Sequence, residues 1–273
     1  MSPLRATVSA LTIYPIKGCR GISVDAFELD ALGPVDDRRY MIVDPTGRFM
    51  SQRSHPVMAQ IVPEVSATHV TLNGFGKPAV SFLRTGPHRP SRTVSIWKSY
   101  DLIADDAGDE SAAWLSDVLQ SPCRLVHTGA AFDRRCSHEN DPVGFADGYP
   151  MLITSEASLA DLNARLVARG EVSLPMDRFR PNIVVRDCEA FAEDTWPRFR
   201  IGGVRMRGAG PCARCIVTTT NQQTSERGVE PLRTLASYRR DPTEGKAVNF
   251  GQNLIAEEEG TVRVGDRLVL IGE

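Results

Sequence analysis

The sharpest chemical feature of the sequence is a pair of cysteines separated by two residues. Residues 210–215 read Gly-Pro-Cys-Ala-Arg-Cys, so that Arg214 stands directly before the second thiol, Cys215. A thiolate is a soft ligand for a transition metal, and a neighbouring guanidinium favours the ionised form of a thiol. The pair therefore indicates a thiolate that holds a soft metal centre, with two buried structural thiols as the plain alternative.

Two other kinds of cysteine site fit the sequence less well. A structural zinc site needs four ligands, and the chain has no second Cys-x-x-Cys, so that only Cys136 and His138 could be recruited. A thioredoxin-like pair opens a helix, whereas residues 216–220 read Ile-Val-Thr-Thr-Thr and predict a β-strand. The cysteines are therefore expected in a loop that enters a strand.

Isolated basic and amide side chains form the second feature. Lys17 follows Tyr-Pro-Ile at the end of a predicted strand, Arg38 precedes another strand, and Arg180 and Asn182 flank a proline before an apolar run. Each of them alone is typical of a surface charge or of a hydrogen bond at a strand end. Together, basic groups that meet at strand ends would form a pocket for an anion such as a phosphate.

The elements that must position these residues read mostly as short strands. Residues 39–50 predict a β-hairpin, because Asp-Pro-Thr-Gly at 44–47 is a turn sequence. Residues 261–271 alternate around Gly-Asp and predict an antiparallel hairpin at the C-terminus. Many short strands and few helices predict a mainly β protein of the α+β class, built as a barrel or sandwich and not as a doubly wound sheet.

Three helices are expected, over residues 110–120, 156–169 and 231–240, from the spacing of their leucines and from their start and stop residues. Between about residues 128 and 150 the chain loses its periodicity and becomes polar. This stretch predicts a long surface loop, and a loop of this length in a compact protein is often functional.

Composition excludes several classes of function. The chain has 273 residues, room for one large or two modest domains, with 32 basic and 34 acidic side chains and no basic block. A nucleic-acid partner is therefore not expected. No apolar run is long enough for a membrane span, and the N-terminus does not read as a secretory signal. Six cysteines in a chain of this length are no disulfide scaffold, which predicts a cytoplasmic protein with free thiols.

Eight short motifs follow one another in a fixed order. They are YPIKGCRG (14–21), DRRY (37–40), LITSEASL (152–159), FRPN (179–182), CARC (212–215), EPLRTL (230–235), FGQ (250–252) and VGD (264–266). Each motif is weak alone, but the ordered set resembles the MOSC family, and within it the mitochondrial amidoxime-reducing component and its bacterial relatives. The resemblance covers nearly the whole chain.

The resemblance implies a fold and a cofactor. The fold is a MOSC β-barrel, expected over residues 126–273, packed against an N-terminal β-barrel-like domain over residues 1–125. The cofactor is a molybdenum cofactor, molybdopterin with Mo, whose metal ligand and catalytic residue would be Cys215. The cofactor contacts of the family fall on Lys17, Arg38, Asp147, Gly148, Tyr149, Arg180, Asn182 and Arg214.

This sequence departs from the family pattern at two of these positions. The animal proteins carry hydroxyl residues where this chain has Gly148 and Tyr149. If side-chain hydroxyls bind the cofactor there, this protein differs from them. If backbone N–H groups bind it, the contact is kept.

The implied activity is the reduction of N-oxygenated, in particular N-hydroxylated, compounds, with oxygen removed at molybdenum. The cysteine pattern of an appended iron–sulfur domain does not occur, so the electrons are expected from a separate cytochrome or iron–sulfur protein with its reductase. Two alternatives stay open. One is a sulfur carrier with a persulfide on Cys215 or Cys212, and the other is a zinc-stabilised β-barrel binding module.

Overall fold

The computed structural model describes residues 6–84, 90–136, 140–243, 245 and 247–271. Within these residues the chain forms 18 strands, three α-helices and four short 3-10 helices. The predicted mainly β, α+β composition is confirmed. In the described part of the chain, no helix combines the length and the apolar composition that crossing a membrane requires.

The largest sheet has eight strands and joins the two ends of the chain. Its order is β18 (Leu268–Leu270), β14 (Arg198–Ile201), β15 (Val204–Ala213), β16 (Asn249–Ala256), β12 (Met151–Ser155), β13 (Ile183–Arg186), β1 (Thr7–Ile13) and β2 (Ile22–Val24). Strand β1 runs antiparallel to β13, with Leu11 opposite Ile183. The apolar face of the sheet buries Leu11, Ile153, Ile183 and Phe199 in one core.

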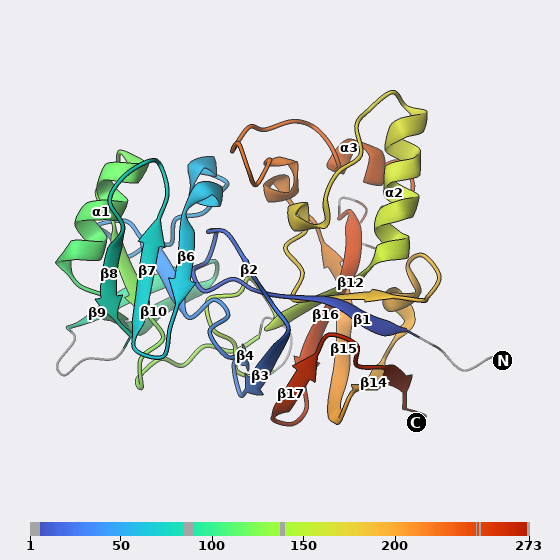
Figure 1. Ribbon diagram of the computed structural model, residues 1–273, viewed down its shortest axis with the longest axis horizontal. Coiled ribbons are helices and arrows are strands. Elements are labelled where there is room, and N and C mark those ends of the chain that lie inside the picture. Colours follow the sequence, from blue (N-terminus) through green and yellow to red (C-terminus); the bar gives the residue numbers. More distant parts are fainter. Residues whose placement is uncertain (1–5, 85–89, 137–139, 244, 246, 272–273) are drawn as a thin grey trace.

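Three smaller sheets complete the β structure. The first is β5 (Tyr40–Val43), β11 (Arg124–His127), β10 (Ser99–Asp106) and β9 (Ser91–Ile96); the second is β6 (Val62–Val65), β7 (His69–Asn73) and β8 (Val80–Leu83); the third is β17 (Gly260–Arg263), β3 (Ala26–Asp30) and β4 (Gly33–Pro34). Figure 1 shows β6–β10 in one lobe and β12–β16 in the other. Strands from both sides of residue 125 share two of the sheets, and the division at residue 125 stays a prediction.

The helices cover the outer faces of the two lobes (Figure 1). Helix α1 (Asp109–Leu119) and helix α2 (Glu156–Ala168) confirm two of the predicted helices. Helix α2 begins where the hydroxyl of Ser155 accepts a hydrogen bond from the backbone N–H of Ser158, at 3.0 Å. The third helix was predicted too long, because α3 (Leu232–Leu235) ends early and the chain then turns to form a bridge between Arg240 and Val248.

One predicted hairpin is confirmed and the other is wrong. The turn after β5 closes with a hydrogen bond from the Asp44 N–H to the Arg48 carbonyl, at 2.9 Å. At the C-terminus, β17 pairs with β3, and β18 pairs with β14. The Gly-Asp turn between them is held by β1 instead, since the Gly265 N–H donates to the carbonyl of Val8 at 2.9 Å.

Candidate functional site

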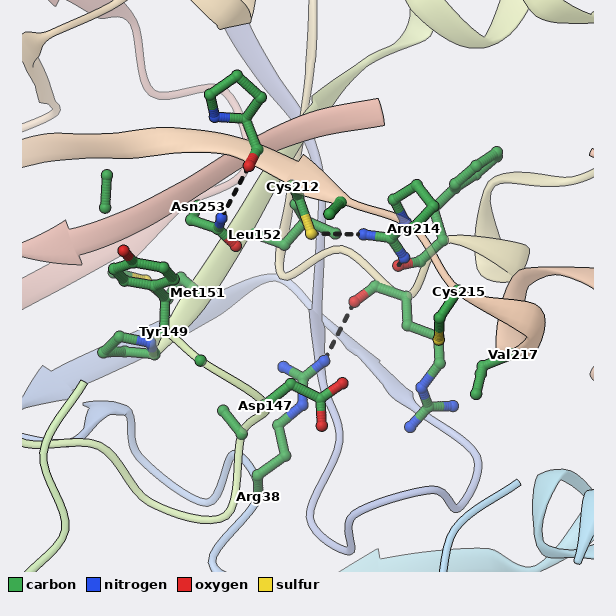
Figure 2. A pocket seen from close by; sticks show the side chains of 18 of the residues that line it. Arg38, Asp147, Tyr149, Met151, Leu152, Cys212, Arg214, Cys215, Val217 and Asn253 are labelled. Atoms are coloured by element: carbon green, nitrogen blue, oxygen red, sulfur yellow. Dashed lines mark hydrogen bonds between the residues drawn. The ribbon is translucent and has the colours of Figure 1, made fainter. Parts of the chain in front are cut away.

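A cavity of about 520 Å³ is lined by residues of both lobes. All nine residues that the sequence singled out line it, namely Lys17, Arg38, Asp147, Gly148, Tyr149, Arg180, Asn182, Arg214 and Cys215. Figure 2 shows Cys212, Arg214 and Cys215 on one side, with Arg38 and Asp147 facing them. Seven of the nine lie more than a hundred residues from Lys17 in the sequence, three of them in the expected loop and four next to the ends of β13 and β15.

A buried hydrogen-bond network fixes Arg38. Its Nη1 donates to Oδ2 of Asp37 at 2.7 Å and to Oδ1 of Asn182 at 2.8 Å. Asp37 in turn accepts from the backbone N–H of Tyr14 at 2.7 Å and from Nδ2 of Asn182 at 2.9 Å. The guanidinium therefore has its position set by residues of both lobes before any ligand binds.

The side-chain amide of Asn182 makes all of its hydrogen bonds within the protein. Besides its bonds to Arg38 and Asp37, it donates to the carbonyl of Thr12 at 3.1 Å and accepts from the N–H of Leu152 at 3.3 Å. Its exposed fraction is 0%. Its role as a cofactor contact stays a prediction, and the hydrogen bonds give it the further role of positioning Arg38.

Tyr14 is a buried residue directly after β1, and two of the arginines that line the cavity contact its ring. The Cζ of Arg38 lies 4.4 Å and that of Arg180 4.2 Å from the centroid of its ring. Burial raises the pKa of Tyr14 to about 12, so the ring stays neutral between the two cations. Both arginines have a left-handed backbone, with φ of 46° for Arg38 and 56° for Arg180. Such backbone strain is concentrated at functional sites.

Lys17 and Asp147, which both line the cavity, form an ion pair. Burial lowers the pKa of the Lys17 ammonium, and the charge of Asp147 opposes this effect. Enclosure raises the pKa of Asp147, but the ammonium of Lys17 and hydrogen bonds from Lys17 and Trp97 outweigh it, so the net shift is downward. The carboxylate stays ionised at neutral pH and holds the lysine in place.

The two cysteines lie where β15 ends. Nη1 of Arg214 lies 2.9 Å from Sγ of Cys212, and its Nη2 donates to the carbonyl of Phe179 at 2.7 Å. Cys215 has no such partner among the described residues, and its side chain lines the cavity.

The segment after Cys215 is a 3-10 helix, η4 (Ile216–Thr219), where a strand was predicted. The hydroxyl of Thr218 donates to the carbonyl of Cys215 at 2.9 Å, and that of Thr219 donates to the carbonyl of Ile216 at 2.8 Å. These local bonds compete with strand pairing. They turn the chain sharply after Cys215 and leave its thiol at the cavity wall.

Gly148 and Tyr149 belong to the expected loop between β11 and β12, in which the described residues form no helix or strand. The ring of Tyr149 packs against a small apolar cluster with Cys136 and Val143. Burial raises the pKa of its phenol, which is therefore neutral at physiological pH.

Four lining or adjoining residues were missed by sequence reasoning, namely Gln52, Arg53, Trp97 and Gln222. Gln52 and Gln222 form a reciprocal amide pair, with N···O distances of 2.9 and 3.0 Å, across 170 residues of sequence. Oε1 of Gln222 also accepts from Nη1 of Arg180 at 3.2 Å. No sequence signal marks such a pair, because glutamines in polar segments are usually exposed.

The donor set of the cavity fits an anionic ligand with a soft metal. Five basic and two acidic side chains line it. Among the described residues, Arg53, Arg180 and Arg214 form no ion pair with a carboxylate, and Nε of Arg214 is a buried donor without a hydrogen-bond partner. Cationic groups of this kind suit a phosphate or a carboxylate, and the two thiols at the same wall are soft metal ligands.

The alternative zinc ligands do not gather in the described residues. No group of three or more His, Cys, Asp or Glu side chains there could hold a metal ion. Cys136 is buried and free, and His138 lies outside the described residues.

Comparison with known proteins identifies both halves of the chain. The MOSC N-terminal beta barrel domain matches residues 5–122, and the MOSC domain matches residues 140–269. The chain is 34% identical to human mitochondrial amidoxime-reducing component 1, over 98% of this chain and 83% of the human protein. It is 37% identical to mitochondrial amidoxime reducing component 2 of Bos taurus, over 95% of this chain and 82% of that protein.

Proposed function

The chain belongs to the MOSC family, and from this premise we propose that it is a molybdenum-cofactor-dependent reductase of N-hydroxylated compounds. One observation carries the proposal. The nine residues to which the family resemblance gives a role in cofactor binding all line a single cavity, although they are spread from residue 17 to residue 215. The names of the relatives point to amidoximes as the substrate class.

Each part of the cavity would have its own task. Cys215 would hold the metal, because its thiol lines the cavity and the turn into η4 fixes its backbone. Lys17, Arg38 and Arg180 would bind the phosphate, because their ammonium and guanidinium groups line the cavity and are positioned in advance by hydrogen bonds and ring contacts. Arg214 would face the metal site with its free Nε.

When bound, the molybdenum cofactor would supply the two-electron chemistry that removes oxygen from the nitrogen of the substrate. The protein places the substrate and sets the charge around it. The positive excess of the lining holds the anionic cofactor, and the ion pair with Asp147 keeps Lys17 from carrying an unbalanced charge.

We propose further that the electrons come from a separate cytochrome or iron–sulfur protein with its reductase, because the cysteines of this chain lack the spacing of an iron–sulfur domain. We also propose a cytoplasmic location, which the six free thiols favour.

The test begins with expression in a host that makes molybdopterin. Molybdenum is measured by mass spectrometry, pterin by fluorescence after oxidation, and activity by the conversion of benzamidoxime to benzamidine with reduced methyl viologen as the electron source. Stoichiometric molybdenum with turnover is the expected result, and Cys215→Ser is the matched control that loses both.

Other outcomes identify the rivals. Zinc in place of molybdenum would establish a zinc-stabilised module. A labile sulfur on Cys215 or Cys212, without molybdenum, would establish a sulfur carrier. Either result overturns the reductase proposal.

A further inference from the structure

Arg53 and Trp97 form a wall of the cavity that the proposed cofactor contacts do not include. Trp97 lies in the turn between β9 and β10, and its Nε1 donates to Oδ1 of Asp147 at 3.1 Å. The Cζ of Arg53 lies 4.4 Å from the centroid of the indole ring. A guanidinium stacked on an indole loses freedom but keeps its N–H groups available at its edge.

Arg53 is held in place from the other lobe. Nη2 of Arg227 donates to the carbonyl of Arg53 at 2.7 Å and also to the carbonyl of Gln52. The side chain of Gln52 is only 1% exposed and is locked in the amide pair with Gln222. The backbone at residues 52–53 is therefore fixed, and Arg53 presents its cation at a set place on the wall.

The N–H groups of Arg53 are open, in contrast to those of the other lining cations. Lys17 and Arg38 pair with Asp147 and Asp37. Arg180 and Arg214 donate to Gln222 and to the carbonyl of Phe179. Among the described residues, the guanidinium of Arg53 has no hydrogen-bond acceptor and no ion-pair partner. Its one cation–π contact there is with the ring of Trp97.

We propose that Arg53 binds a carboxylate on the substrate, and that the enzyme therefore prefers N-hydroxylated substrates that carry an anionic group. This inference rests on the proposed function. A planar guanidinium with a free edge matches a carboxylate with two parallel hydrogen bonds. Arg53 is exposed, whereas Lys17 is buried, so a group that reaches Arg53 projects toward the mouth of the cavity. A substituent on the substrate occupies that place, while the phosphate of the cofactor has the buried cations.

The test compares two substrates that differ only in the carboxylate, benzamidoxime and 4-carboxybenzamidoxime, in the loaded enzyme. The quantity is the ratio of their kcat/KM values. A hydrogen-bonded ion pair in a cavity predicts a ratio that favours the carboxylate, and a fall of roughly tenfold in that ratio in Arg53→Gln. Arg53→Lys is expected between the two, because it keeps the charge and loses the two-bonded geometry.

Two further measurements make the result decisive. Arg169→Gln removes an exposed arginine from the end of α2, outside the cavity, and is expected to leave the ratio at its wild-type value. The molybdenum content of Arg53→Gln is expected to equal that of the wild type. An unchanged ratio in Arg53→Gln overturns the proposal, and so does a loss of molybdenum and pterin, which would make Arg53 a ligand of the cofactor phosphate.

A failure of the proposed function gives a different pattern. Calorimetry with 4-carboxybenzamide and benzamide, which have no N–O bond to reduce, measures the carboxylate site without turnover. Binding of the carboxylated amide that is roughly tenfold tighter in the wild type than in Arg53→Gln supports the site even if no amidoxime is reduced. Equal binding of 4-carboxybenzamide to both proteins overturns it.

Discussion

Replacing Asp37 with alanine is expected to release Arg38 from its fixed position in the cavity and to lower the stability of the fold. The carboxylate is 2% exposed and accepts hydrogen bonds from the backbone N–H of Tyr14, from Nδ2 of Asn182 and from Nη1 of Arg38. Asn182 and Arg38 keep other partners in the variant. The N–H of Tyr14 loses its partner, and the guanidinium of Arg38 loses the charge that balances it.

The magnitude follows from these two losses. Breaking a buried ion pair by removing one partner costs about 3–5 kcal/mol, because an uncompensated charge remains. For a protein of this size, each kcal/mol lowers the melting temperature by roughly 2 °C or more, so Asp37→Ala is expected to melt roughly 6 °C or more below the wild type. Its molybdenum content should also fall, because Arg38 is no longer held toward the cavity.

The assay is thermal unfolding followed by circular dichroism, with an exposed ion pair as the control. Asp117 pairs with Lys77 on the surface of α1, and its side chain is 57% exposed. Asp117→Ala is expected to change stability by less than about 1 kcal/mol. If Asp37→Ala melts within experimental error of Asp117→Ala, the network around Arg38 does not carry the stability assigned to it, and the reasoning is refuted.

Two more predictions follow from the cysteines and from a buried carboxyl. Cys215→Ser is expected to lose nearly all molybdenum while Cys212→Ser keeps most of it, measured by mass spectrometry; the reverse result would exchange their roles. Burial raises the pKa of Glu193, whose exposed fraction is 0%. Below the unfolded pKa of about 4.3 the carboxyl is protonated in both the folded and the unfolded state, and the fold has its full stability. As the pH rises from there through the higher folded pKa, the unfolded state loses its proton more readily, and the free energy of unfolding falls. Glu193→Gln should melt above the wild type at pH 8 and lose this advantage toward pH 4; an equal difference at both pH values contradicts the assignment.

The residues that could be predicted are those whose types carry the chemistry. Cys215, Arg180 and Lys17 stand out because a thiol pair or a single cation interrupts an otherwise apolar or turn segment. The class of the fold and two helices follow from periodicity, which is a local property of the chain. An anion pocket was predicted for the basic residues from their place at strand ends, and the family resemblance added Cys215 to it; the structure shows all of them lining one cavity.

The features that escaped prediction depend on contacts that the local sequence does not contain. β-branched residues in Ile-Val-Thr-Thr-Thr favour a strand, but the hydroxyls of Thr218 and Thr219 bond back to the preceding carbonyls and form a 3-10 helix. The C-terminal strands alternate as a hairpin would, yet each finds its partner elsewhere in the chain. The amide pair of Gln52 and Gln222 forms only when the fold brings the two distant segments together, so the local sequence does not predict it.

The arrangement of the cavity couples ligand binding to the docking of the two lobes. Arg38 comes from the N-terminal part and Arg180 from the C-terminal part, yet both stack on Tyr14, and Nη2 of Arg38 donates to the carbonyl of Arg180 at 3.2 Å. A phosphate bound by both arginines gains its full binding free energy only when the lobes are docked. By linkage, such a ligand stabilises the docked arrangement by the same free energy. Asp37 balances the charge of Arg38, whereas Arg180 forms no ion pair with a carboxylate among the described residues, so a bound anion would balance the second cation beside the ring of Tyr14.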